Sequence, residues 1–416
     1  MERFKYYTKI LISFFLHIFW IFPIRKNKVF MMNDHSYSFS DNLKYLALDL
    51  IEKDPEKYKF YFSLKNPEGI GDLPITPVKW LSIKHFYHAL TSAVLITNNG
   101  GTAYLPIRKS QLAINTWHGG GPYKVTGTQA LTDYYNMSED DGKSEAEKLK
   151  EQKKNQKLIY WFEKDLKYNA KKMDYMLSSC KMCTDAEAKG MFYSDEQCLD
   201  SGMPRMDWMF KADKVKAIKE KVFAKYGIPS DKKLILYAPT FRGFFADYAG
   251  VITDDYLEID HKNAVKAAEE RFGGEWVFAV RLHPRLKDAK INSEGIINMT
   301  QYPDAQELLM SVDMLITDYS SVMWDVSFSK NPVLLFATDI NDYQVKRGFY
   351  LPVEEWPFPL AASNDELIEN IMSFDFDSYE QKVKAHHEAV GSFETGNACN
   401  IVKSIIDKHI DGPVKR

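Results

Sequence analysis

The sequence predicts an α/β protein built from two doubly wound domains that face a cleft, and three observations lead to this prediction. Apolar, strand-like runs alternate with helical patterns along most of the 416 residues. This alternation is interrupted by a charged stretch at residues 209–227 and then starts again. A chain of this length also fits two domains of roughly 200 residues each better than one. Alternating strands and helices are typical of parallel sheets covered by helices on both faces. Ligands of such sheets bind at the carboxyl ends of the strands.

The individual elements follow from the apolar runs and from the turn residues that separate them. In the first half, strands are predicted at 29–33, 59–63, 94–97, 112–117 and 176–179, and helices at 42–51, 85–93 and 139–172. In the second half, strands are predicted at 234–238, 276–282, 296–299, 314–317 and 332–336, and helices at 211–225 and 398–410. We expect three parts: an N-terminal segment at residues 1–27, a first domain at 28–210 and a second domain at 211–416. The last helix is a candidate to pack back across the domains.

The first part carries an almost wholly apolar run at residues 10–24, flanked by Lys5, Lys9, Arg25, Lys26 and Lys28. A helix that spans a membrane needs about 20 apolar residues, so this run is short for that purpose. Aromatic side chains next to basic ones suit the headgroup region of an anionic membrane. We therefore predict a peripheral, membrane-associating segment on the cytoplasmic face, and the alternative is a helix packed on the protein's own core.

Composition excludes several classes of protein. The net charge of −3 gives no global basic field, so no nucleic-acid partner is expected. Four cysteines are too few and too scattered for a disulfide framework. Cys180 and Cys183 form a CxxC pair, but no second pair completes a zinc site, so free buried thiols are predicted. No metal ligands are assigned.

The first motif that carries chemistry follows the strand-like run at 112–117. His118 stands where a general base at the carboxyl end of a strand would be placed. Gly119 and Gly120 follow it and would let the backbone approach an anionic ligand closely. The spacing matches neither a dinucleotide-binding glycine motif nor a phosphate-binding P-loop, so neither of these classes is supported.

Two further motifs follow strands of the second half. After 234–238, Thr240 offers a hydroxyl group, and Arg242 offers a cationic fork suited to phosphate. Near the end of the strand predicted at 276–282, Arg281 is expected to bind phosphate or to orient His283, which Pro284 exposes at the tip of the strand.

The last two motifs follow later in the chain. Asp318, Ser320 and Ser321 come after the strand at 314–317, and the two serines could cap a helix whose positive end faces a phosphate. Arg347 belongs to a cationic corner before an aromatic pair. Each motif alone has an ordinary structural explanation, but together they supply what is needed to hold a pyrophosphate and transfer one phosphoryl group.

These motifs, in this order, resemble the CDP-glycerol glycerophosphotransferase family that builds teichoic acids and capsules. The matching stretches are Thr116-Trp-His-Gly, Gly202-Met-Pro-Arg-Met-Asp, Tyr237-Ala-Pro-Thr-Phe-Arg, Arg281-Leu-His-Pro, Asp304 to Leu309, residues 316–325 and Arg347-Gly-Phe-Tyr. One departure is Gly120-Gly121-Pro122, where the family usually continues with Thr-Pro, so the acceptor or the polyol could differ.

The resemblance implies a GT-B fold, with residues 28–210 on the acceptor side and residues 211–416 holding the nucleotide donor. It implies a donor that is CDP-glycerol or CDP-ribitol, and an acceptor that is a lipid-linked saccharide or a polyol phosphate. The acceptor hydroxyl would attack the phosphorus next to the polyol, with CMP as the leaving group. His118 would act as the base and His283 would assist the leaving phosphate, although the two roles could be exchanged.

The sequence also bears on the cofactor and on the type of activity. No cofactor is expected, because helix ends and guanidinium groups can carry the charge of the phosphates. Asp375-Phe-Asp377 is interpreted as a polar turn rather than a metal site. Primase and polymerase activities are both compatible with the sequence. The alternatives are a nucleotide-sugar glycosyltransferase of the same fold and a non-enzymatic scaffold that uses the lysine-rich stretch at 148–172 to hold an anionic polymer.

Overall fold

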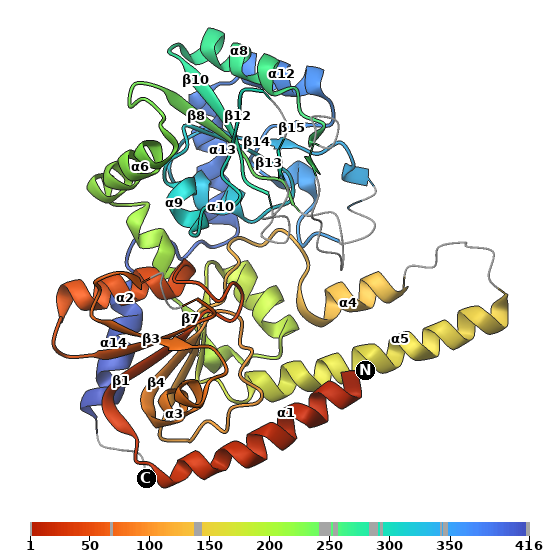
Figure 1. The fold of residues 1–416 in the computed structure, drawn as a ribbon. Coiled ribbons are helices and arrows are strands. Elements are labelled where there is room, and N and C mark those ends of the chain that lie inside the picture. The colour runs from red at the N-terminus through yellow and green to blue at the C-terminus, as the bar shows by residue number, and fades with distance from the viewer. Residues whose placement is uncertain are drawn as a thin grey trace. The chain divides into compact units, whose positions relative to one another are not determined.

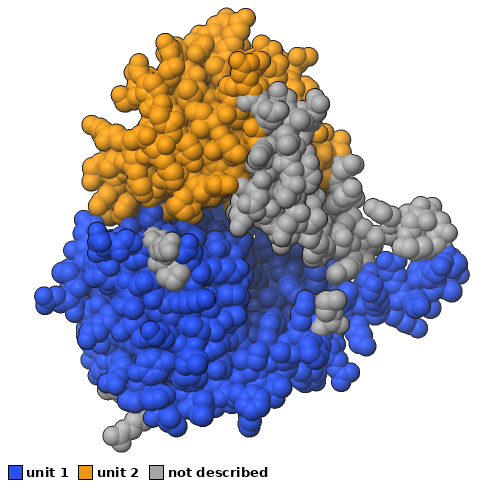
Figure 2. All heavy atoms as spheres, viewed as in Figure 1, with its two compact units in different colours: residues 1–207, 346–350, 391–416 blue, residues 208–345, 351–390 orange. Residues whose placement is uncertain are grey.

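The computed structural model describes residues 2–66, 70–136, 144–240, 251–252, 257–282, 290–291, 294–341, 343 and 348–412 (Figure 1). The chain forms two compact units (Figure 2). Unit 1 consists of residues 1–207, 346–350 and 391–416, and unit 2 consists of residues 208–345 and 351–390. Two segments from late in the sequence, the short one at 346–350 and the C-terminal one, therefore belong to unit 1.

A seven-stranded sheet in the order β3-β2-β1-β4-β5-β6-β7 forms the centre of unit 1. All six neighbouring pairs of strands are parallel. The strands are β1 (Arg25–Met32), β2 (Lys59–Leu64), β3 (Ile75–Lys79), β4 (Ser92–Thr97), β5 (Leu112–Asn115), β6 (Tyr175–Ser178) and β7 (Cys198–Asp200). Its helices include α1 (Glu2–Leu16), η1 (His17–Ile21), α2 (Asp41–Lys53), α3 (Ile83–Thr91), α4 (Gly127–Asn136), α5 (Glu145–Ala170), η3 (Cys183–Ala188), η4 (Asp195–Gln197), η5 (Pro204–Trp208) and α14 (Ala398–Asp411).

The central strands of this sheet form because their sequences suit burial on both faces. All six residues of β4 and all four residues of β5 are buried. Continuous apolar runs of this kind are typical of parallel sheets that are covered on both sides. The strands predicted from those runs in the first half of the chain are confirmed. Strands β3 and β7, which lie at the two edges of the sheet, were not predicted.

The C-terminal helix α14 packs against α2 in unit 1. Its first turn is capped by the Asp207 carboxylate, which accepts hydrogen bonds from the backbone N–H groups of Ala398 (2.9 Å) and Cys399 (2.8 Å). Such a cap satisfies N–H groups that have no partner within the helix. All four cysteines are free thiols. Cys180, Cys183 and Cys399 are buried, as predicted, whereas Cys198 is only half-buried.

Unit 2 contains a six-stranded sheet in the order β12-β10-β8-β13-β14-β15, in which all pairs are again parallel. The strands are β8 (Lys233–Tyr237), β10 (Trp276–Val280), β12 (Ile296–Asn298), β13 (Met314–Thr317), β14 (Val333–Phe336) and β15 (Leu360–Ala361). A separate parallel pair is formed by β9 (Val251–Ile252) and β11 (Lys290–Ile291). The helices include α6 (Ala212–Tyr226), α8 (His261–Phe272), α9 (Ala305–Leu309), α10 (Val322–Ser327), η7 (Val353–Glu355), α12 (Asn364–Met372) and α13 (Phe376–Ala389).

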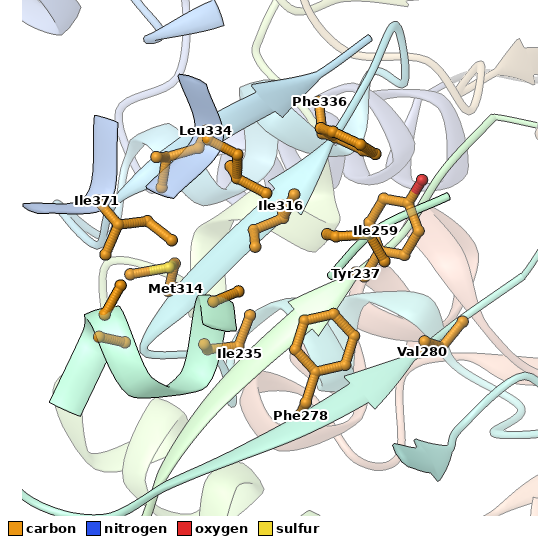
Figure 3. Close-up of a cluster of buried hydrophobic side chains, with 14 of the residues drawn as sticks. Ile235, Tyr237, Ile259, Phe278, Val280, Met314, Ile316, Leu334, Phe336 and Ile371 are labelled. Carbon is orange, nitrogen blue, oxygen red and sulfur yellow. The ribbon is translucent and has the colours of Figure 1, made fainter. Parts of the chain in front are cut away.

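One face of the second sheet supplies much of the core of unit 2 (Figure 3). Alternate residues of a strand point to the same face. The buried pairs at this spacing are Ile235 and Tyr237, Phe278 and Val280, Met314 and Ile316, and Leu334 and Phe336. Helices α8 and α12 cover this face with Ala264, Ala268, Leu367 and Ile371. The predicted strands of the second half are confirmed, and among the described residues the strands that were not predicted are the two-residue β15 and the β9–β11 pair.

At the N-terminus, α1 lies along α5 in unit 1 (Figure 1). The Lys9 ammonium group pairs with Asp165 at 2.6 Å, and the Tyr6 ring packs against Trp161 and Tyr168. Ser13 and Leu16 are buried, but most apolar side chains of α1 and η1 are exposed. None of the described helices combines the length and the apolar character that a membrane-crossing helix requires.

Asp375, the first residue of the predicted polar turn, caps α13. Its carboxylate accepts hydrogen bonds from the backbone N–H groups of Asp377 (3.0 Å) and Ser378 (3.3 Å).

Candidate active site

The loops that follow β1, β4 and β5 bring the first group of candidate residues together in unit 1. These three strands are neighbours in the sheet, and all run in the same direction. Their carboxyl ends therefore lie at one edge, which carries His35 after β1, Asn98 after β4 and His118 after β5.

A tight turn positions His118. Trp117, the residue before it, has a left-handed backbone with φ 55°. Its N–H donates to Asn115 Oδ1 at 3.0 Å, and its carbonyl oxygen accepts from Asn42 Nδ2 at 3.0 Å. Asn42 is fully buried near the start of α2 and also donates to the carbonyl oxygen of Thr116 at 3.2 Å. A non-glycine residue with positive φ is uncommon, and it persists when its surroundings fix it.

The surroundings of His118 define its protonation. Its Nδ1 lies 3.1 Å from the carbonyl oxygen of Asn98. A carbonyl oxygen only accepts, so Nδ1 carries a proton and donates it. Burial is the main cause that lowers the pKa of His118 to about 4, and the neighbouring His35 lowers it further. Near neutral pH the imidazole is therefore uncharged, and Nε2 holds the lone pair that a general base needs.

Asp41 and Arg205 complete the polar surroundings of this histidine. Asp41 accepts hydrogen bonds from Asn98 Nδ2 at 2.6 Å and from Arg205 Nη1 at 3.2 Å. Its charge raises the pKa of His118, whereas Arg205 lowers it, and both effects are smaller than that of burial. The Arg205 N–H also donates to Asn42 Oδ1 at 3.1 Å, so the segment after β7 is tied to the start of α2.

His35 is the second imidazole at this edge, and sequence reasoning missed it. Its ring stacks on that of His118, with 4.2 Å between ring centroids and 14° between planes. A signal existed, because His35 follows one predicted strand closely, as His118 does. That signal could be used only with the strand order, which the sequence did not provide.

Close packing explains part of the glycine-rich loop. A Cβ atom on Gly119 would lie 2.9 Å from Trp117 Nε1, so a larger residue does not fit without movement. Gly121 has φ 68°, and its N–H donates to Ser179 Oγ at 3.1 Å. Gly120 is buried between them. Burial raises the pKa of Glu187, which lies on the nearby η3, to about 7. These contacts shape the loop, and anion binding by Gly119 and Gly120 stays a prediction.

The segment that contains the last motif lies beside this loop in unit 1. Phe349 forms an antiparallel bridge with Lys124, and the N–H of Tyr350 donates to the carbonyl oxygen of Tyr123 at 2.9 Å. The Tyr350 hydroxyl lies 3.1 Å from both the N and Oγ1 atoms of Thr126. Arg347 itself, like Arg242 and His283, lies outside the described residues.

In unit 2, a buried carboxylate joins two of the predicted motifs. Asp318 follows β13 and Thr240 follows β8, and these strands are neighbours. Asp318 is fully buried, and its oxygens accept from the N–H of Thr240 at 2.9 Å and from its hydroxyl at 2.6 Å. The structure therefore brings these residues together, and it shows that Asp318 fixes the position of Thr240.

Ser320 and Ser321 follow directly. Ser321 occupies the N-cap position of α10, but its side chain makes no capping hydrogen bond. Ser321 thus stands where the cap was predicted, but the capping hydrogen bond is not formed. The reason is that Ser321 has a helical backbone (φ −61°, ψ −7°) rather than the extended one usual for an N-cap. Neither serine hydroxyl hydrogen-bonds to a described residue, so both remain available as donors.

Arg281 is held by the loop after β12. Its Nη1 donates to the carbonyl oxygens of Tyr302 at 2.7 Å and Met299 at 3.4 Å, and burial lowers its pKa. Part of the guanidinium group is therefore used to hold the backbone of unit 2. Phosphate binding by Arg281 stays a prediction.

The chain matches a known family over almost its whole length. Residues 14–408 match the family model described as CDP-glycerol:poly(glycerophosphate) glycerophosphotransferase. Among curated proteins, it is 27% identical over 389 residues to a teichoic acid poly(glycerol phosphate) polymerase of Staphylococcus epidermidis, covering 90% of this chain and 49% of that protein. It is 24% identical over 400 residues to a teichoic acid ribitol-phosphate primase of Bacillus spizizenii, covering 94% of this chain and 93% of that protein. The chain thus spans about half the length of some curated relatives and nearly all of others.

Solved structures show the same fold. A structure of the wall teichoic acid polymerase TagF superposes with a TM-score of 0.78 at 23% sequence identity, covering 99% of this chain and 97% of that one. The predicted GT-B architecture with two parallel sheets is therefore confirmed.

Proposed function

The chain belongs to the CDP-glycerol:poly(glycerophosphate) glycerophosphotransferase family, and from this premise we propose that it transfers a polyol phosphate from a CDP-polyol to an acceptor hydroxyl. The donor is CDP-glycerol or CDP-ribitol, since relatives named for both polyols align over most of the chain. The product is a phosphodiester of the kind found in teichoic acids and capsules, and the second product is CMP.

The environment of His118 is the observation that carries this proposal. Transfer requires a group that removes the proton of a hydroxyl nucleophile as it attacks phosphorus. The hydrogen bond from Nδ1 to Asn98 and the low pKa of His118 leave Nε2 able to do this near neutral pH.

In the proposed reaction, the acceptor oxygen forms a bond to the phosphorus that carries the polyol. The phosphoanhydride bond between this phosphorus and the bridging oxygen breaks, and the bridging oxygen leaves with its electron pair as part of CMP. The hydroxyl proton passes to Nε2 of His118, and solvent later removes it. Charge and atoms balance without a further reactant.

We assign the donor's phosphates to the predicted hydroxyl and cationic groups that follow β8, β10 and β13, and to Arg347. Thr240 is fixed by Asp318, and the Ser320 and Ser321 hydroxyls stand at the start of α10. Prepositioned hydroxyl donors such as the two serines stabilise charge that grows on phosphate oxygens during transfer. The N–H and the hydroxyl of Thr240 both donate to Asp318, so in this geometry Thr240 shapes the loop after β8. His283, Arg242, Arg281 and Arg347 are assigned to the same task from the sequence, with His283 also a candidate to assist the leaving CMP.

We propose that the protein acts at a membrane surface, where its acceptor is a lipid-linked saccharide or a polyol phosphate. Apolar side chains on α1 and η1 are open to solvent, among them Phe14, Phe15, Ile18 and Ile21, which are 65–74% exposed. Exposed apolar groups at this density mark an interaction surface. Basic side chains nearby, such as Arg25 and Lys26, favour anionic headgroups. Lys28 does not contribute, because it is buried and donates to Thr91 Oγ1 at 2.6 Å.

The proposal is tested by supplying purified protein with CDP-glycerol, CDP-ribitol or UDP- and GDP-sugars, together with a lipid-linked acceptor, with and without EDTA. We expect CMP release from a CDP-polyol that depends on the acceptor. UDP or GDP release without CMP would instead identify a sugar transferase. The EDTA arm tests the expectation from the sequence that no metal is required.

A further inference from the structure

The loop after β1 holds an imidazole over the proposed base. His35 is exposed to solvent, and its ring stacks on His118 in a nearly parallel arrangement. Among the described residues, this stack is the only ring contact of His35, and its side chain makes no hydrogen bond. The side chain therefore does not help to hold its own loop in place.

The loop is fixed by the residues on either side of His35. Asp34 accepts from the N–H of Gly101 at 2.6 Å and from the Thr97 hydroxyl at 2.5 Å. Asn33 accepts from the N–H of Ser36 at 2.9 Å and donates to Ser40 Oγ at 3.1 Å. The loop after β1 is thus held by hydrogen bonds of its backbone and of neighbouring side chains, while the ring of His35 contacts His118.

The stack has two consequences for His118. It covers one face of the His118 ring, and Nδ1 is already bound to Asn98, so rotation away from this geometry breaks both contacts. His35 also opposes protonation of His118 together with burial and Arg205, while Asp41 and the bond to Asn98 favour protonation. Both consequences keep Nε2 oriented and unprotonated.

We propose that His35 is a positioning residue of the transfer reaction, which fixes the ring of His118 through the stack. This inference rests on the proposed role of His118 as the base. His35 is not assigned a bond to substrate, and it acts through the stacked ring.

Three variants test the inference, with acceptor-dependent CMP release measured as a function of pH. His35→Phe keeps an aromatic ring for the stack and removes the two ring nitrogens. His35→Ala removes both. His88→Ala is the matched control, because His88 also stacks in unit 1, on Tyr61 at 4.0 Å, but lies on α3 before β4, away from the carboxyl ends of the strands.

We expect His35→Ala to lower kcat about 10- to 100-fold with little change in KM, because misplacement of a base costs rate rather than binding. His35→Phe should retain a plateau kcat near that of the unmodified protein. In both variants the fall of kcat at acidic pH should move to higher pH, because an influence that lowers the pKa of His118 is lost. His88→Ala should leave the profile unchanged.

Unchanged kcat and an unchanged acidic limb in both His35 variants would overturn the inference. A His118→Ala variant measured alongside separates this failure from a failure of the proposed function. If His118→Ala still turns over, the base assignment is wrong. If His118→Ala is inactive while the His35 variants behave as the unmodified protein does, only the role of His35 is wrong.

Discussion

The Nδ1 atom of His118 lies 3.1 Å from the carbonyl oxygen of Asn98, and this contact determines which nitrogen of the imidazole is free to accept a proton. Asn98 is itself fully buried and donates to Asp41 at 2.6 Å, so the carbonyl cannot turn away easily. The fold thus selects one tautomer of a histidine through backbone geometry, in a part of the sheet where three strand ends meet.

This relationship predicts a neutral His118 with the proton on Nδ1 at pH 7. Nitrogen-15 NMR of protein labelled at histidine, assigned with a His118→Gln variant, distinguishes the two tautomers and the cation. We expect no protonation of Nε2 between pH 8 and pH 6, because the pKa is lowered to about 4. A proton on Nε2 in this range would contradict the assigned geometry.

The Asp318–Thr240 pair predicts coupled effects on stability and donor binding. Thr240→Val removes the hydroxyl that donates to a buried carboxylate at 2.6 Å. Losing a hydrogen bond to a charged group should lower the free energy of unfolding by about 2 kcal/mol, measured by urea denaturation. KM for the CDP-polyol should rise as the loop loosens. Thr240→Ser keeps the hydroxyl and serves as the control, so equal effects of the two substitutions would count against the pair.

Ser320 and Ser321 should behave differently from a serine that supports the fold. Their hydroxyls make no hydrogen bond to described residues, so Ser320→Ala and Ser321→Ala should leave the melting temperature unchanged. Each should raise KM for the CDP-polyol about 10-fold if it donates to phosphate. Ser327→Ala is the matched control in α10, because its hydroxyl is engaged with Trp324 and His387. That variant should lose stability and keep its KM.

The exposed apolar surface of α1 predicts binding to lipid. The double variant Phe14→Ser, Phe15→Ser should weaken sedimentation with vesicles of phosphatidylglycerol and phosphatidylcholine by at least about 10-fold, since each buried phenyl contributes about 2 kcal/mol. Phe376→Ser in unit 2 removes another exposed phenyl and should have no effect. If the double variant sediments as the unmodified protein does, another surface binds the membrane.

The sequence was sufficient to predict most of the fold because parallel strands buried on both faces leave long apolar signatures. The runs that became β4, β8, β10 and β13 are of this kind. Short edge strands such as β3, which contains Pro77, and the two-residue β15 carry no such signature. The sequence places Lys28 among the basic residues expected to face lipid headgroups. Lys28 is buried instead, because β1 begins at Arg25 and includes it.

The site was predictable only where a motif follows a strand. His118, Thr240 and Asp318 were found in this way, but Asp41, Asn98 and Arg205 were not, although Arg205 lies in a stretch shared with the family. Asp41 begins α2 after β1, Asn98 follows β4, and Arg205 lies in η5 after β7, so these three side chains are far apart in the sequence and meet only in the folded unit. Spacing along one sequence does not reveal the order of strands in a sheet, so it could not place His35 beside His118.

Acceptor-dependent release of CMP from a CDP-polyol by the His118→Ala variant, compared with the unmodified protein, tests the central claim most directly. The account predicts that kcat falls by about 10²- to 10⁴-fold, as expected for the loss of a general base, with the urea unfolding midpoint preserved. Release of CMP by a folded His118→Ala protein at the unmodified rate would contradict it.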